Sequence, residues 1–214
     1  MLMIVLVLIV MSALLLLSQD LAHKMKLRPE LKRKVFHISA AIFIAAWPWL
    51  ISWRSIEILG LLMLAIIMAN KLLHVFNFTK DLGRVTHGDI FLAMAVTICA
   101  YLSHNKLFFA LALLNVALAD GLAALAGQRY GRHYKYKVLH QPKTVIGTMT
   151  FWMASVCIFA VGLLLGHNQV SFSSYVYLVA GLPPLLALIE NVSPQGLDNL
   201  SVPVAVVVTL NLLH

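Results

Sequence analysis

An aspartate inside an apolar stretch is the residue with the clearest chemical potential in this sequence. Asp120 lies near the end of an apolar run at about residues 107–127 and precedes a group of glycines and cations. Ionisable groups are costly in hydrocarbon, so those found in membrane segments usually have a function. A carboxylate also suits Mg²⁺ that is shared with phosphate oxygens. We expect Asp120 to be such a ligand; the alternative is a carboxylate paired with a cation between packed helices.

The residues that follow Asp120 are of the types that bind phosphate. Gly127 and Gly131 at a helix end would let backbone N–H groups approach phosphate closely. Their G-x-x-x-G spacing is also typical of close helix packing, so both interpretations stay open. Arg129 and Arg132 can contact phosphate oxygens with two N–H groups at once. This segment therefore predicts a phosphate-binding turn.

A second cationic segment contains Lys143 and Thr144. Lys143 would act as a point charge, and Thr144 could hydrogen-bond a phosphate or a metal ion. Pro142 stands where a Walker loop has glycine, so this is not that motif. Lys135 and Lys137 are interpreted equally well as signals of membrane orientation.

Basic residues also begin two other apolar runs. Arg33 and Lys34 precede the second run, and Arg84 precedes the fourth. Positive charge at a helix start opposes the helix dipole unless an anion is present, so we expect these side chains to bind a lipid or nucleotide phosphate. His37 follows Arg33 by one turn and is either a catalytic residue or an interfacial hydrogen-bonding residue.

Two acids flank the last polar turn of the chain. Glu190 closes the seventh apolar run, where negative charge opposes the helix dipole. Asp198 opens the eighth run, where capping of the helix would explain it equally well. With Asp120, the two acids would complete a metal site or provide a base for a hydroxyl group.

The elements that position these residues are predicted from composition. The chain has 214 residues, of which 61% are hydrophobic and 11% charged, so we expect an all-α polytopic integral membrane protein. Apolar runs of spanning length suggest about eight transmembrane helices. The expected spans are residues 1–18, 35–53, 56–76, 89–104, 107–127, 148–166, 174–190 and 200–213.

Loop charge predicts the orientation of these spans. Fourteen of the 16 Lys and Arg residues fall in loops on one side, and Arg54 and Lys106 fall on the other. The positive-inside rule then places the active-site loops in the cytoplasm and both termini outside. The net charge of +8 follows from these membrane-flanking loops, so nucleic acid is not an expected partner. No linker divides residues 1–214, which predicts a single transmembrane catalytic domain. Cys99 and Cys157 are interpreted as packing residues.

Taken together, these motifs resemble the CTP-dependent polyprenol/dolichol, phytol and diacylglycerol kinase family. The resemblance covers roughly residues 32–204 and rests on the order and spacing of several short motifs. These are Arg33-Lys34-x-x-His37, Arg84-x-x-x-Gly88, Asp120-x-x-Ala-x-x-x-Gly127-x-x-x-Gly131, Lys143-Thr144-x-x-Gly147, Glu190, and Asp198-Asn199-Leu-x-Val-Pro203.

The resemblance implies a set of site residues. It places Asp120, Gly127, Gly131, Lys143, Thr144 and Gly147 in a nucleotide site. It implies that Glu190, Asp198 and Asn199 complete the catalytic centre. The chain departs from the family pattern at Ile146, where relatives usually carry glutamate, and this puts metal binding and nucleotide preference in question.

The function implied is transfer of the γ-phosphoryl group of CTP, with Mg²⁺, to a membrane lipid alcohol. An isoprenoid alcohol or diacylglycerol would accept it, and CTP rather than ATP follows from the resemblance alone. One alternative is a CTP-dependent cytidylyltransferase that makes a CDP-lipid, since such enzymes share part of the motif. Another is a transporter or a non-catalytic lipid-binding protein. The oligomeric state stays open, a homo-oligomer included.

Overall fold

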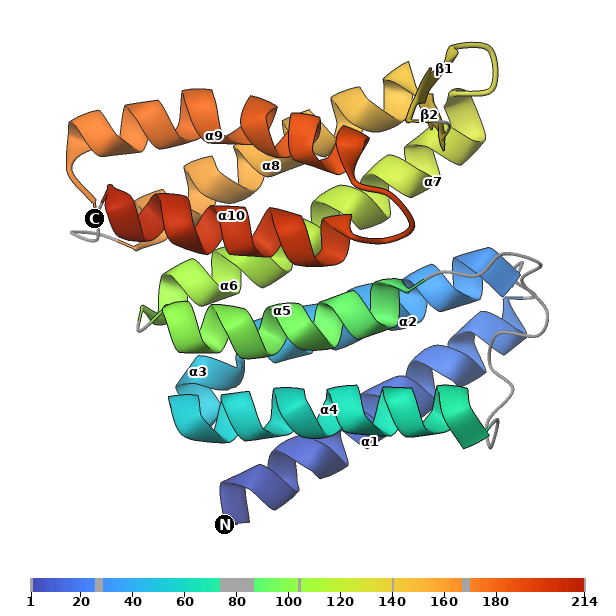
Figure 1. Ribbon diagram of the computed structural model, residues 1–214, viewed down its shortest axis with the longest axis vertical. Helices are drawn as coiled ribbons and strands as arrows, with labels where there is room; N and C mark the ends of the chain where they lie inside the picture. The colour runs from blue at the N-terminus through green and yellow to red at the C-terminus, as the bar shows by residue number, and fades with distance from the viewer. Residues whose placement is uncertain are drawn as a thin grey trace.

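The chain folds into packed helices, as a computed structural model shows for residues 2–25, 29–73, 87–103, 105–139, 141–166 and 170–213 (Figure 1). The prediction of an all-α fold is confirmed apart from one small hairpin. The helices are α1 (Leu2–Lys24), α2 (Pro29–Ala45), α3 (Trp47–Leu50), α4 (Trp53–Leu73), α5 (Gly88–Leu102), α6 (Lys106–Leu114), α7 (Gly121–Tyr130), α8 (Val145–Leu165), α9 (Phe172–Val192) and α10 (Asp198–Leu212).

Four helical segments are long and apolar enough to cross a membrane, judged by length and composition. They are Trp53–Leu73, Lys106–Tyr130, Val145–Leu165 and Phe172–Val192, and each matches a predicted span to within a few residues. The other four predicted spans correspond to shorter apolar helices, Leu2–Ser18, Lys34–Leu50, Gly88–Leu102 and Asp198–Leu212. The eight apolar helices are therefore present, while eight complete crossings stay a prediction.

The segment Lys106–Tyr130 forms the centre of the bundle. Its most apolar window is 67% buried, against 17% for the corresponding window of α4. Phe108 and Phe109 on this segment are among the largest fully buried side chains. A π-helical turn, η2 (Asn115–Asp120), separates α6 from α7. Such turns insert a residue into a helix and often occur at functional sites, because they rotate the side chains that follow. Asp120 is the last residue of this turn.

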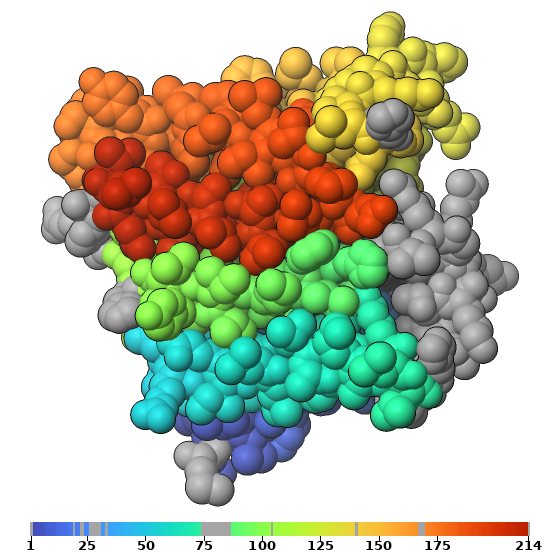
Figure 2. Space-filling view, in the orientation of Figure 1, coloured from blue at the N-terminus to red at the C-terminus, as the bar shows by residue number. Residues whose placement is uncertain are grey.

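The outer helices present apolar side chains outward. On α4, Ile58, Leu61 and Ile66 are all more than half exposed. Figure 2 shows α10, α5 and α4 lying side by side across one face of the molecule. A large apolar surface of this kind is what a membrane-embedded helix bundle requires.

A short antiparallel hairpin, not predicted from the sequence, joins α7 to α8. Strand β1 (Lys135–Val138) pairs with β2 (Gln141–Thr144), and Tyr136 lies opposite Lys143. Leu139 in the connecting turn has a positive φ of 45°, which is uncommon for a residue with a side chain. The segment expected to be a phosphate-binding loop therefore has a defined backbone that fixes the direction of Lys143.

Candidate active site

Three acids from separate elements meet at one end of the bundle. Asp120 ends the π-helical turn, Glu190 lies in the last turn of α9, and Asp198 is the first residue of α10. One carboxylate oxygen from each lies within 4.8 Å of the others. The structure thus brings together the three residues that the sequence analysis selected as metal ligands.

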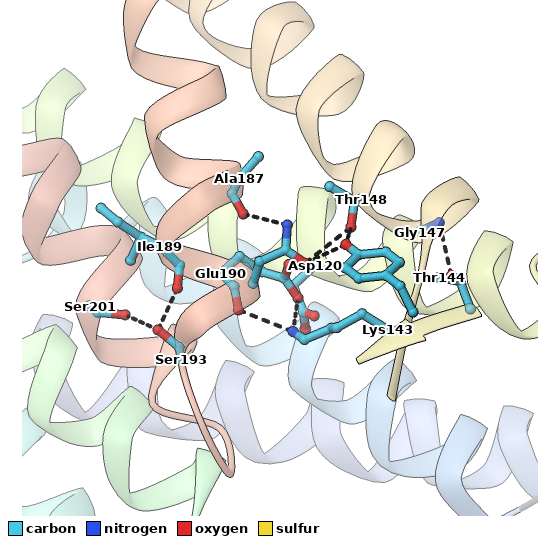
Figure 3. Close-up of polar contacts among 12 residues, drawn as sticks. Asp120, Lys143, Thr144, Gly147, Thr148, Ala187, Ile189, Glu190, Ser193 and Ser201 are labelled. Carbon is cyan, nitrogen blue, oxygen red and sulfur yellow. Dashed lines mark hydrogen bonds and ion pairs between the residues drawn. The ribbon is translucent and has the colours of Figure 1, made fainter. Parts of the chain in front are cut away.

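Two lysines pair with this acidic cluster. The Lys34 Nζ atom on α2 lies 2.9 Å from Asp120 Oδ2, and the two side chains are 14% and 18% exposed. The Lys143 Nζ atom on β2 lies 2.5 Å from Glu190 Oε1 and also donates to the Glu190 carbonyl oxygen (Figure 3). Two ammonium groups therefore pair with two of the three acids.

The donor set has the chemistry that Mg²⁺ prefers. That ion binds carboxylate oxygens and usually takes only one or two from the protein, with water or phosphate completing its shell. The Asp198 Oδ1 atom is buried and has no hydrogen-bond partner within the part of the chain that the structure describes. A buried carboxylate oxygen without a partner is unfavourable unless something else binds it. Asp120, Glu190 and Asp198 are therefore the residues that would hold the ion.

Capping does not explain Asp198. The N-cap position of α10 is Leu197, and no side chain caps this helix end by hydrogen bonding. The carboxylate instead lies close enough to Asp120 and Glu190 to interact electrostatically with both. Asp198 thus does not cap α10 by a hydrogen bond, although its place in the first turn is still favourable for the helix dipole, and its neighbours are the other two acids.

A cavity of about 520 Å³ opens beside the acids. Asp120 and Glu190 lie on its wall together with three cationic side chains from α7–β2 and the glycines of the α7–α8 crossing. The cationic residues are Arg132, Lys135 and Lys143. A concave site with acidic and cationic side chains next to each other suits a polyanion that carries a divalent cation.

Thr144 lines the cavity and also lies at the start of α8. It ends β2 and caps α8, where its hydroxyl oxygen accepts a hydrogen bond from the Gly147 N–H at 3.0 Å. A Cβ atom added at Gly127 would lie 2.6 Å from Thr144 Oγ1, and one added at Gly131 would lie 2.6 Å from the Gly127 oxygen. These glycines are thus needed for close packing, while Gly127, Thr144 and Gly147 also line the cavity.

The structure does not place the other predicted phosphate-binding cations on the cavity wall. The Arg129 guanidinium lies 5.4 Å from the centre of the Tyr130 ring, and Arg129 is not part of the cavity wall. Lys34 was expected to bind phosphate, but its contact here is with Asp120. Arg33 belongs to α2, although its side chain lies outside the description. Arg84 falls outside the described residues altogether.

The two remaining candidates flank the acidic cluster. His37 is half-buried on α2 and lies close enough to Asp120 to interact electrostatically. Asn199 is buried, and its Nδ2 atom donates to the Gly88 carbonyl oxygen at the start of α5. Gly196, with a φ of +92°, packs its backbone against Gly88 at the same junction. Asn199 therefore holds the α9–α10 turn against α5, one residue from Asp198.

Three further polar residues near the cavity were not found from the sequence. Tyr136, Thr148 and Asn191 form a hydrogen-bonded group between the hairpin, α8 and α9. Each is an ordinary residue type outside any motif, and only the fold brings them together.

No family model and no solved structure matches this chain. The chain is 32% identical over 194 residues to a phytol kinase from Synechocystis sp., covering 87% of this chain and 81% of that protein.

The helical fold and the apolar outer surface define an integral membrane protein with a polar site at one end of its bundle. At this level of identity and coverage, the chain belongs to the phytol kinase family. This membership agrees with the resemblance to lipid kinases and does not favour the cytidylyltransferase alternative.

Proposed function

We propose that the protein is a multi-pass membrane kinase that transfers the γ-phosphoryl group of CTP, with Mg²⁺, to an isoprenoid alcohol. The observation that carries the proposal is the meeting of three acids from separate elements beside a cation-lined cavity. Family membership supports phosphoryl transfer to a lipid alcohol, with a phytol-type alcohol as the first acceptor to test. The choice of CTP is supported by the motif resemblance.

The cationic side of the cavity is suited to the triphosphate. Arg132 and Lys135 are exposed at the cavity and can neutralise phosphate charge from solvent. An ammonium group has three N–H donors, so Lys143 can retain Glu190 and donate to a phosphate oxygen as well. Because phosphoryl transfer depends mainly on positioning and on charge neutralisation, these contacts would supply much of the catalysis.

The acidic side is suited to the acceptor hydroxyl. The alcohol oxygen forms a bond to the γ-phosphorus while the bond from that phosphorus to the bridging oxygen breaks, which releases the nucleoside diphosphate. The Asp198 Oδ1 atom, which has no partner among the described residues, would bind the ion, and we assign the hydroxyl proton to the other oxygen of the same carboxylate. When bound by the three acids, Mg²⁺ would neutralise phosphate charge.

The place of the acids in the bundle fits a lipid acceptor. Glu190 and Asp198 lie at the ends of two apolar helices, and Lys34 begins the apolar stretch of α2. An alcohol with its tail among such helices would present its hydroxyl at their ends. Loop charge supports a cytoplasmic position for this end of the molecule.

Purified protein in lipid nanodiscs tests the proposal directly. CTP or ATP, each with and without Mg²⁺, would be incubated with phytol, a polyprenol and diacylglycerol. We expect a lipid monophosphate and CDP from an isoprenoid alcohol with CTP and Mg²⁺. Release of pyrophosphate would indicate nucleotidyl transfer instead, and absence of a phosphorylated lipid from every combination would reject the kinase proposal.

A further inference from the structure

A group of neutral hydrogen bonds joins the hairpin to the two helices behind it. The Tyr136 hydroxyl donates to Asn191 Oδ1 at 2.6 Å and is also hydrogen-bonded to the Thr148 hydroxyl. The single Thr148 hydroxyl hydrogen can go either to the Tyr136 oxygen or to the same Asn191 oxygen, which lies 3.2 Å away. The Asn191 Nδ2 atom donates to the Ala187 carbonyl oxygen at 2.9 Å, which fixes the orientation of its side chain on α9. Figure 3 shows dashed hydrogen bonds at Thr148 and Ala187, two of the residues in this group.

The register of the hairpin relates this group to Lys143. Tyr136 and Lys143 lie directly opposite each other on β1 and β2, so both side chains project from the same face. Tyr136 contacts Asn191, and Lys143 contacts Glu190, the preceding residue of α9. A single cross-strand pair therefore docks on two consecutive residues of one helix.

The hairpin needs such an attachment. It has two strands of four residues each, and an isolated two-stranded hairpin is marginally stable in water. The ion pair of Lys143 with Glu190 would be weakened when a phosphate competes for the lysine. The hydrogen bond from Tyr136 to Asn191 is neutral, and neither of these residues lines the cavity, although Thr148 does. A bound polyanion therefore competes for this bond less than for the Lys143 ammonium group.

We propose that Tyr136 is a positioning residue that holds Lys143 at the cavity by attaching the hairpin to Thr148 and Asn191. The expected effect on nucleotide binding rests on the proposed function, in which Lys143 contacts the nucleotide. The attachment itself can be measured without nucleotide.

The test compares Tyr136→Phe with Tyr134→Phe in the full-length protein in detergent. Tyr134 is an exposed tyrosine just before the same strand and serves as the matched control. Acylation of individual lysines by an amine-reactive ester would be followed by mass spectrometry. We expect Lys143 to be labelled about fivefold faster in Tyr136→Phe, as loss of one hydrogen bond implies, and at the original rate in Tyr134→Phe.

Lys34 provides an internal control, because it is an equally buried lysine paired with an acid on another element. Its labelling should stay constant in Tyr136→Phe. Equal acceleration of Lys34 and Lys143 would indicate general loosening and overturn the inference, as would unchanged labelling of Lys143. Asn191→Leu should reproduce the effect, and adding it to Tyr136→Phe should give little more, because both remove the same contact.

Kinetics then test the consequence for the site. The KM for CTP should rise about fivefold in Tyr136→Phe and stay unchanged in Tyr134→Phe. Faster labelling of Lys143 with an unchanged KM would overturn the role of Tyr136 in nucleotide binding. If the original protein phosphorylates no alcohol, the proposed function fails, whereas the labelling experiment still decides whether Tyr136 positions Lys143.

Discussion

Two kinds of lysine–acid pair occur in this molecule, and they differ in burial more than in geometry. Lys71 and Asp89 lie 3.2 Å apart with side chains 31% and 47% exposed, while Lys143 and Glu190 lie 2.5 Å apart with 18% and 10% exposed. Exposed pairs contribute little to stability, because water solvates each partner well. Buried pairs lose that solvation and are kept mainly where they have a function. The comparison indicates that burial of the charges, rather than pairing alone, distinguishes the pair at the candidate active site from the pair on the surface.

The largest expected difference between buried and exposed pairs is in kcat/KM, after the acid of one pair of each kind is neutralised. Asp120→Asn should lower kcat/KM for phosphoryl transfer roughly 1,000-fold, because it removes a charge that orders the reacting groups. Asp89→Asn should change it less than about twofold. Initial rates with labelled CTP measure both, with size-exclusion profiles to show that each variant folds. Similar losses in the two variants would remove the distinction between the pairs.

The affinity for a divalent metal ion should also differ between variants of the acidic cluster and variants of exposed acids. The expected change is smaller than the change in kcat/KM. Asp198→Asn should weaken binding of Mn²⁺, used as a paramagnetic substitute for Mg²⁺, about 100-fold. Asp89→Asn should leave the affinity unchanged. Electron paramagnetic resonance in the absence of nucleotide measures the bound fraction, and chelation by EDTA should abolish lipid phosphorylation. Equal Mn²⁺ affinity in Asp198→Asn and the original protein would exclude Asp198 as a ligand.

Removing the lysine of a pair should affect nucleotide binding. Lys143→Met should raise the KM for CTP roughly 30-fold, since it deletes a charged hydrogen-bond donor, whereas Lys71→Met should not. Lys143→Met should also lower the melting temperature by leaving Glu190 buried without its cation. Adding Glu190→Gln should restore the melting temperature but not the KM. Recovery of both would make Lys143 a structural residue.

Two glycines allow a similar comparison between a closely packed position near the candidate site and an open position on α9. Gly131→Ala should destabilise the protein by about 1–3 kcal/mol, because its Cβ atom would lie 2.6 Å from the Cβ atom of Thr144, which caps α8. Gly181 on α9 has nothing within 4 Å of such an atom, so Gly181→Ala should stabilise by roughly 0.5–1 kcal/mol. Thermal unfolding in detergent measures both changes. Equal effects would show that the α7–α8 crossing tolerates a methyl group.

The acids of the candidate site could be predicted from the sequence, because charged residues are rare in an apolar chain. Asp120, Glu190 and Asp198 stood out against their surroundings, and the structure places them together. Their cations could not be assigned, since Lys34 pairs with an acid 86 residues away through tertiary packing. Local patterns carry no information about such a choice.

The hairpin was missed for a different reason. Two-residue hairpin turns are usually recognised by glycine or asparagine, and this one contains Leu139 at a positive φ. Its strands are rich in lysine, which is uncommon in strands, and Lys135 and Lys137 were interpreted equally well as phosphate-binding residues or as signals of orientation. The π-helical turn before Asp120 has no simple sequence signature either. Both features arise from packing around the site.

The separation of paired residues along the chain has a consequence for biosynthesis. Asn199 donates to Gly88 across 111 positions, and the acid beside it belongs to the last helix. During translation, the earlier lysines and Asp120 therefore enter the membrane before their final carboxylate neighbour exists. A ribosome-bound chain that stops before Asp198 lacks one of the three candidate metal ligands. We therefore expect the candidate metal site to form only after Asp198 has been synthesised.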